Sequence, residues 1–237
     1  MPGMEEMKQF LRRDMDRNIN MLYFLEDNPV DIIQRTGNSV ILRGRSDRRW
    51  TYISCPDELE LAGLVPFLDE RDRSFAVVED WMMPLLTGGK RVKWKLSTVK
   101  LILPEHVNVS PVPFMHIRSL SPADIQSIYE HSEYIDFISA GYIRERIMSG
   151  PSAGIPVNGT LAGWIMTHDD GAIGFLHIVE DYRRKGYAKA LMAHMIQQVR
   201  GTGRIPFVHI EETNFKSMGL ALQLGFYRDR LVHWFEI

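Results

Sequence analysis

One stretch of this sequence indicates the fold and the site: His177-Ile178-Val179-Glu180-Asp181-Tyr182-Arg183-Arg184-Lys185-Gly186-Tyr187-Ala188. An apolar run of strand type ends at Val179, a short charged loop follows, and a helix is predicted to begin at Gly186. Free N–H groups and the positive end of the dipole make a helix N-terminus favourable for anions. Glycine lets a phosphate approach the backbone closely, and basic side chains add charge-assisted hydrogen bonds. The pattern favours a nucleotide-like ligand, with ordinary surface decoration as the alternative.

Outward from this stretch, the sequence predicts a mixed α/β fold. Three strands are expected over residues 155–157, 161–167 and 172–179, joined by the turn sequences Asn158-Gly159 and Asp169-Asp170-Gly171, which are typical of hairpins. Ser121 and Pro122 are expected to open a helix as its cap and first residue. Further strands are predicted at 114–118, 207–210 and 226–237, and further helices at 142–148, 186–199 and 215–224. Hairpins combined with one βαβ unit indicate a mixed sheet.

The N-terminal part is predicted to be a separate α/β half-domain. Its expected helices lie at 4–16, 21–25, 57–65 and 81–86, and its expected strands at 39–43, 50–54, 74–78 and 92–103. Pro104, Pro111 and Pro113 then surround a weakly patterned stretch that is typical of a linker. We therefore expect one half-domain over residues 1–110 and another over 111–237. The similar element order of the halves is compatible with an internal duplication.

Composition excludes several classes of protein. The 237 residues carry a formal net charge of −2, which does not suggest a nucleic-acid-binding surface. The single cysteine, Cys55, cannot form a disulfide within the chain, and a small strand-end residue is its expected role. No apolar run approaches the roughly 20 residues that cross a bilayer, and the charged N-terminus has no signal core. We expect a soluble cytoplasmic protein without nucleic-acid or membrane partners.

The segment Arg183-x-x-Gly186-x-Ala188 resembles the R/Q-x-x-G-x-G/A signature of the GNAT superfamily of N-acetyltransferases. Downstream, Asn214-x-x-Ser217 and Leu224-Gly225-Phe226 resemble its N-x-x-A/S…L-G-F segment at the usual spacing. The text from Gly171 to Arg183 looks closest to the glycine N-acyltransferase-like branch. The resemblance implies a GNAT acyltransferase fold in the C-terminal half, preceded by a GNAT-like half-domain that carries no acyl-CoA signature.

The resemblance also implies an activity and a site. The expected reaction moves an acetyl or other short acyl group from acyl-CoA to a primary amine of a small molecule or amino acid by direct attack. No metal is expected, and a homodimer is left open. Backbone groups of Leu176 to Ile178 would pair with the pantetheine, and amides from Arg184 to Lys189 would hold the pyrophosphate. The implied cofactor-binding residues are Leu176, His177, Ile178, Arg183, Arg184, Lys185, Gly186, Tyr187, Ala188, Lys189, Asn214 and Ser217.

The expected catalytic side chains are missing. Many relatives place a glutamate where this chain has Ala172, and a tyrosine where it has Ala221. The candidates for proton transfer are Glu211 and His177. Glu211 lies on or just after the strand that carries His209. A packed histidine or a helix-capping glutamate would explain the same residues without catalysis.

Two rival functions are considered. Because Ala172 and Ala221 replace the familiar side chains, the chain could be a non-catalytic acyl-CoA-binding module. The sequence Gly150-Pro151-Ser152-Ala153-Gly154 also matches the G-x-S-x-G pattern of serine hydrolases. That pattern requires a strand before the serine and a helix after it. Here a helix is predicted before Ser152 and a strand after it, which favours a turn.

Overall fold

The computed structural model describes residues 3–113, 115–131 and 138–237. Two compact units are present, and each is described by itself. The first contains Met1–Lys100, Ile210–Asn214 and Arg228–Ile237, and the second contains Leu101–His209 and Phe215–Tyr227. The proposed boundary at residue 110 stays a prediction.

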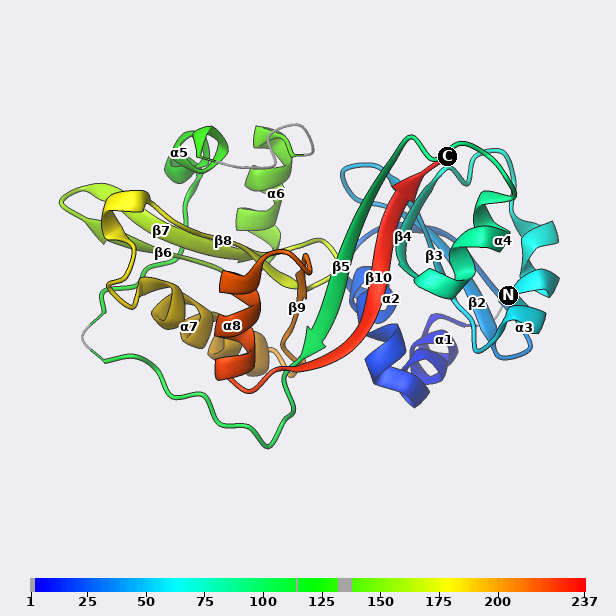
Figure 1. Ribbon diagram of the computed structural model, residues 1–237, viewed down its shortest axis with the longest axis horizontal. Helices are drawn as coiled ribbons and strands as arrows, with labels where there is room; N and C mark the ends of the chain where they lie inside the picture. Colours follow the sequence, from blue (N-terminus) through cyan, green and yellow to red (C-terminus); the bar gives the residue numbers. More distant parts are fainter. Residues whose placement is uncertain (1–2, 114, 132–137) are drawn as a thin grey trace. The chain divides into compact units, whose positions relative to one another are not determined.

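The first unit is a helix pair, a three-strand meander and two further strands (Figure 1). Its elements are α1 (Met4–Leu11), α2 (Met15–Asp27), β1 (Val30–Thr36), β2 (Ser39–Arg45), β3 (Arg49–Ser54), α3 (Glu58–Leu64), β4 (Ser74–Glu79), α4 (Met83–Thr87) and β5 (Trp94–Ile102). The C-terminal strand β10 (Tyr227–Glu236) joins them, and the strand order is β1-β2-β3-β4-β10-β5. β3 and β4 run parallel, whereas β1, β2 and β3 pair antiparallel.

The second unit repeats this order of elements. It contains α5 (Ile125–Glu130), α6 (Ala140–Ser149), β6 (Ser152–Val157), β7 (Thr160–Thr167), β8 (Ile173–Ile178), α7 (Tyr187–Gly201), β9 (Phe207–Ile210) and α8 (Phe215–Gln223). Its strands are ordered β9-β8-β7-β6, with an antiparallel meander and a parallel β8–β9 pair. Helices α5 and α6 lie over one face of the β6–β8 meander and α7 over the other (Figure 1).

Local signals explain most of these elements. Asn158 and Gly159 have φ angles of 51° and 82°, the positive pair that a tight hairpin turn requires. Asp57 caps α3 by accepting a hydrogen bond from the Glu60 N–H. Ser121 and Asp124 form a capping box at the start of the helical segment before α5.

Three expectations need correction. The helix expected over 4–16 is interrupted at Arg12–Asp14 because Asp14 caps α2 by accepting from the Arg17 N–H. The strand expected at 114–118 provides only an isolated bridge from Arg118 to Gly154, and Phe114 lies outside the described residues. Strand β1 was not predicted, because this edge strand is half exposed and lacks a strong apolar alternation.

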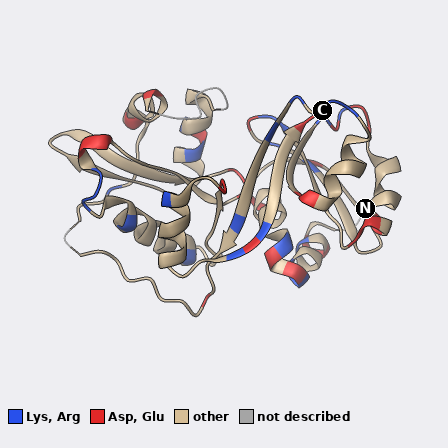
Figure 2. Ribbon diagram, in the orientation of Figure 1, with Lys and Arg blue, Asp and Glu red and all other residues tan. Residues whose placement is uncertain are grey.

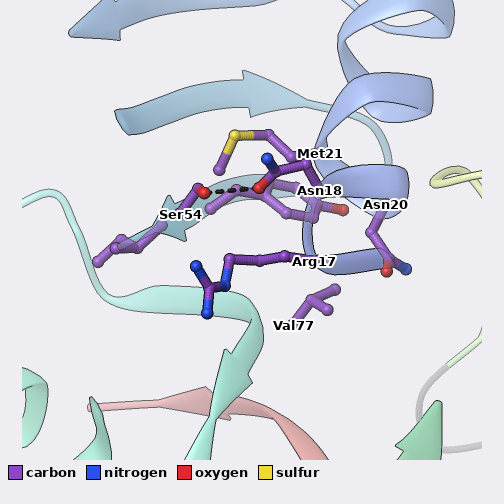
Figure 3. A pocket seen from close by; sticks show the side chains of 8 residues that line it. Arg17, Asn18, Asn20, Met21, Ser54 and Val77 are labelled. Atoms are coloured by element: carbon purple, nitrogen blue, oxygen red, sulfur yellow. Dashed lines mark hydrogen bonds between the residues drawn. The ribbon is translucent and has the colours of Figure 1, made fainter. Parts of the chain in front are cut away.

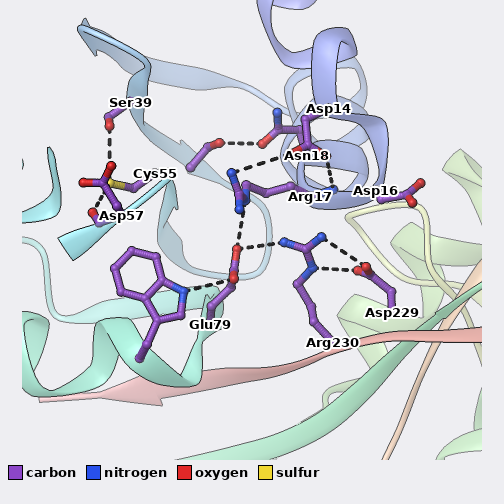
Figure 4. A network of polar contacts seen from close by, with 12 residues as sticks. Asp14, Asp16, Arg17, Asn18, Ser39, Cys55, Asp57, Glu79, Asp229 and Arg230 are labelled. Atoms are coloured by element: carbon purple, nitrogen blue, oxygen red, sulfur yellow. Dashed lines mark hydrogen bonds and ion pairs between the residues drawn. The ribbon is translucent and has the colours of Figure 1, made fainter. Parts of the chain in front are cut away.

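Each unit has its own core. In the first unit Phe75 of β4 stacks on Phe235 of β10, with ring centroids 4.9 Å apart. A polar network also fixes β10 there: Glu79 accepts from Arg17 at 3.0 Å and from Arg230 at 2.9 Å, and Arg230 also pairs with Asp229 (Figure 4). In the second unit, α5 and α6 pack on Trp164 and Met166, and α7 turns its predicted apolar side inward.

Candidate functional site

The loop between β8 and α7 has the backbone of an anion site. Gly186 is the N-cap of α7 with φ 81° and ψ 1°, and no side chain caps the helix. The first N–H groups of an α-helix have no carbonyl partner inside the helix. Arg184 also has a positive φ, of 64°, so the chain curls just before the helix begins. Uncapped amides therefore gather at Gly186 as the sequence predicted, and they suit a phosphate group.

The basic side chains of this loop have different tasks. Arg183 donates from Nε to the Ile178 carbonyl at 3.1 Å, and Lys185 donates from Nζ to the Asp181 carbonyl at 2.9 Å. Both therefore hold the loop in shape, although the sequence suggested only a role as free positive charges. Within the described residues, no hydrogen bond or ion pair holds the Arg184 side chain. Acidic residues on the short helix before the loop and basic residues within it are visible in Figure 2.

Strands β8 and β9 part next to this loop. Their parallel register has one pair, Ile173 with Val208, among the described residues. Beyond it, Phe175 has a φ of 53°, and the register with β7 shifts between the Trp164 and Met166 pairs. Such a bulge bends a strand and frees its backbone groups. The half-buried residues from Leu176 to Ile178 follow this bulge and lie beyond the Ile173–Val208 register pair of β8 and β9.

His177 lies on the face of the meander that α5 and α6 cover. Its ring stacks on Trp164 with centroids 4.6 Å apart, and the His131 ring lies 6.2 Å from it. Nδ1 of His131 donates to the Ser127 carbonyl at 2.8 Å, because a carbonyl oxygen can only accept. His177 is thus a half-buried side chain in an aromatic cluster. A packing role accounts for these contacts, and its catalytic role stays a prediction.

The remaining predicted residues are distributed over both units. Ser217 lies in the first half of α8, in the second unit. Glu211 and Asn214 belong to the segment Ile210–Asn214 of the first unit, where the Asn214 N–H donates to the Glu211 carbonyl at 2.9 Å. The roles of these three residues stay predictions.

The two positions without the familiar catalytic side chains are buried. Ala172 and Ala221 are both fully inaccessible to solvent. The residue opposite Ala172 is His168, whose backbone N–H donates to the Ala172 carbonyl at 2.8 Å. Sequence reasoning missed His168. The register that the Asp169-Asp170-Gly171 turn imposes on the two strands is the signal that could have found it.

The corresponding loop of the first unit is built differently. There the end of β3 leads to α3, where the Glu60 N–H donates to the carboxylate of Asp57. Where β3 and β4 run side by side, α2 inserts Asn18, which accepts a hydrogen bond from Ser54 (Figure 3). The cavity left there measures about 10 Å³, roughly the room that one water molecule needs. A carboxylate at the helix and a filled space are unfavourable for a pyrophosphate and a pantetheine arm.

Three other candidate centres have ordinary explanations. Ser152 begins β6 directly after α6 and is buried, so the strand-to-helix turn of a nucleophile elbow is not formed. Cys55 is buried, its thiol donates to the Asp57 carbonyl, and burial raises its pKa. Such a thiol is a poor nucleophile. The part of the chain that the structure describes contains no cluster of metal-ligating side chains and no helix long and apolar enough to span a bilayer.

Comparisons with known proteins agree with this geometry. Residues 154–235 match the family model of FR47-like proteins. No curated protein matches the sequence. A solved Drosophila protein superposes with a TM-score of 0.78 at 17% identity and covers 100% of this chain and 97% of its own.

Two further similar structures are described as members of the GNAT superfamily. A GCN5-related N-acetyltransferase from Kribbella flavida has a TM-score of 0.59 at 13% identity, with 95% of each chain covered. A tandem GNAT protein from the clavulanic acid biosynthesis pathway has a TM-score of 0.54 at 14% identity, with 92% of this chain and 87% of its own covered. The predicted fold class is therefore confirmed: the chain has the mixed α/β fold of GNAT acetyltransferases. The glycine N-acyltransferase-like branch stays a prediction.

Proposed function

We propose that this protein is an N-acyltransferase that moves an acetyl or other short acyl group from acyl-CoA to a primary amine. The observation that carries the proposal is the uncapped N-terminus of α7 at Gly186, which the loop after Ile178 connects to the strand that parts from β9. An anion site and a strand end that departs from its parallel neighbour, both in one segment, suit the pyrophosphate and the pantetheine of a single ligand. The FR47-like match over residues 154–235 covers this segment.

The cofactor contacts follow from this arrangement. Amides of the turn from Arg184 to Lys189 would hold the pyrophosphate, with the Arg184 side chain as the mobile cation. Backbone groups of Leu176 to Ile178 would pair with the pantetheine and place an N–H near the thioester oxygen, where it would stabilise the developing negative charge. Asn214 and Ser217 are proposed to contact the cofactor from the start of α8.

The proposed reaction is direct attack. The amine loses a proton, its nitrogen forms a bond with the thioester carbonyl carbon, and the carbon–sulfur bond breaks to release CoA. Glu211 and His177 are the proton acceptors that the sequence suggests. The acceptor is proposed to be a small molecule or an amino acid, and a homodimer is compatible with the proposal.

We further propose that residues 1–110 are a GNAT-like half-domain that has lost acyl-CoA binding. The two units share the order helix pair, meander, helix, parallel strand and helix. Only the second has an uncapped glycine at the helix that follows the meander, whereas Asp57 occupies that place in the first. One acyl-CoA site per chain follows from this difference.

A non-catalytic acyl-CoA-binding module is the second candidate. It is favoured by one observation: Ala172 and Ala221 are buried alanines where acyltransferases of this type often carry their acid and base. Such a protein would bind acyl-CoA tightly and release no CoA thiol with any amine.

The deciding experiment combines binding with turnover. Thermal-shift measurements with acyl-CoAs of increasing chain length would be followed by a thiol-release assay over amines and amino acids. Gly186→Glu should abolish the thermal shift because it places a carboxylate at the phosphate site. Gly201→Glu, at the exposed C-terminal end of the same helix, is the matched control and should bind normally. Failure of every acyl-CoA to stabilise the protein would refute the proposal, and binding without turnover would favour the second candidate.

A further inference from the structure

His168 occupies the position across the sheet from the missing carboxylate. Thr167 pairs with Ile173 in the β7–β8 ladder, and the His168 N–H donates to the Ala172 carbonyl at 2.8 Å. Residues opposite each other in an antiparallel pair point to the same face. His168, the residue directly after β7, therefore shares a face with Ala172 and with Trp164 and Met166 of β7, which pack under α5 and α6.

Small residues make room for this imidazole. A Cβ atom added to Gly174 would lie 2.2 Å from Nε2 of His168, so only glycine permits the ring to rest on the strand. The ring also contacts Phe175, the bulge residue, with centroids 4.5 Å apart. Gly174 and Phe175 begin the part of β8 that does not pair with β9. The imidazole thus lies beside the point where the strands part, on the face opposite α7.

The surroundings keep His168 neutral. Burial lowers its pKa to about 4, a nearby Asp169 carboxylate opposes the shift, and the Arg146 guanidinium adds to it. Arg146 is held by a 3.0 Å bond to the His168 carbonyl, and Asp169 accepts a 3.0 Å bond from the Tyr142 hydroxyl. The other titratable groups of this turn and of α6 are Asp170, Arg144 and Glu145. Among the described residues, no hydrogen bond or ion pair engages the imidazole itself.

We propose that His168 is the general base that accepts the proton of the acceptor amine, in place of a carboxylate at position 172. This inference rests on the proposed acyltransferase function. One proton leaves the ammonium group for the imidazole, the nitrogen lone pair forms the carbon–nitrogen bond, and the carbon–sulfur bond breaks. The second proton passes from the new amide nitrogen to the departing thiolate. An amide, a CoA thiol and protonated His168 result, and His168 returns its proton to solvent.

The test compares histidine variants of the full chain with acetyl-CoA and the best amine of the panel. His168→Gln keeps the polar shape but removes the base, and it should lower kcat by about 100-fold or more, as expected for a lost general base. The KM for acetyl-CoA should stay within about twofold. His194→Gln is the matched control: this half-buried histidine on α7 also has a pKa lowered by burial, and its variant should keep full activity.

Two readouts separate catalysis from packing. His168→Ala leaves a hole above Gly174, and added imidazole should restore part of its kcat without changing the KM for acetyl-CoA. The double variant His168→Ala/Ala172→Glu should also recover activity, because it returns a carboxylate to the opposite strand. The acid limb of kcat/KM should lie near the low pKa of His168, well below the value of about 6.5 for an ordinary imidazole.

The outcomes separate the inference from the proposed function. A wild-type protein that transfers no acyl group overturns the proposed function. An active wild type whose His168→Gln variant keeps its kcat and its pH profile overturns only the role of His168, and parallel His177→Gln and Glu211→Gln variants then show which other group acts. A His168→Gln variant that loses acetyl-CoA affinity as much as kcat also overturns the inference, because that pattern reports a structural role.

Discussion

The αL conformation at the start of α7 makes Gly186→Ala a sharp test of the proposed acyl-CoA site. The new Cβ meets no obstacle, because its nearest neighbour is Met115 Cε at 3.9 Å. The effect of the substitution therefore comes from the backbone conformation. With φ at 81°, an L-residue such as alanine costs about 1–2 kcal/mol relative to glycine. If the loop adopts this turn only to bind the pyrophosphate, the Kd for acetyl-CoA should rise roughly 5- to 30-fold. If the free protein also keeps the turn, the same free energy is lost from folding.

Calorimetric titration with acetyl-CoA measures the change in Kd, and urea unfolding measures the change in the free energy of unfolding. Gly201→Ala is the matched control, since an added Cβ there meets nothing within 4 Å and the φ is not positive. Replacing this glycine at the last residue of α7 should leave the Kd unchanged and stabilise the fold by up to about 1 kcal/mol. If Gly186→Ala alters neither the Kd nor the free energy of unfolding, the αL turn has no role in the site and the reasoning fails.

Three further predictions follow from the same contacts. Arg184→Gly should raise the free energy of unfolding by up to about 1 kcal/mol, because glycine relieves the positive φ of 64°, while calorimetry should show weaker acetyl-CoA binding from the lost charge. Asp72→Ala should lower the free energy of unfolding, measured in urea, by about 3–5 kcal/mol. The variant leaves the buried guanidinium of Arg43, which is bonded to Asp72 at 2.7 Å, without its counter-ion. Unchanged stability would contradict this prediction. The folded-state pKa of His168, about 4, lies below its ordinary value, so protonation favours the unfolded chain. The contribution of neutral His168 to the free energy of unfolding should be fully present above about pH 6.5 and should decrease as the pH falls toward 4. Melting curves of His168→Gln should show a smaller decrease over that range.

Much of the second unit could be predicted from local sequence signals. The turn at Asn158-Gly159 and the capping box at Ser121 act over a few residues, and both form as expected. The helix over 186–199 was predicted from apolar spacing, and α7 confirms it within two residues at its C-terminal end. Strand β1 could not be found this way, because its half-exposed residues carry little apolar contrast and β2 alone pairs with it.

The candidate site shows the same division between local and non-local information. The proposed anion site at Gly186 depends on residues adjacent in sequence, so a motif could indicate it. His168 could not be found from neighbouring residues, because its surroundings are provided by the opposite strand. Only the hairpin register places its ring next to Ala172 and Gly174. A missing catalytic side chain in a sequence pattern is therefore weak support for lost activity, since a neighbouring strand can supply the group.

The repeated order of elements makes clear why fold alone does not locate the site. Both units present a helix after a three-strand meander, and both follow it with a parallel strand. A helix N-terminus attracts an anion only when its amides are free. In the first unit the Asp57 carboxylate accepts from one of those amides, the Glu60 N–H, and would also repel phosphate, whereas no side chain caps the amides that follow Gly186 in the second. In the proposed function, this difference in capping assigns acyl-CoA binding to the second unit, and the hydrogen bond from Ser54 to the Asn18 side chain fills the corresponding space in the first.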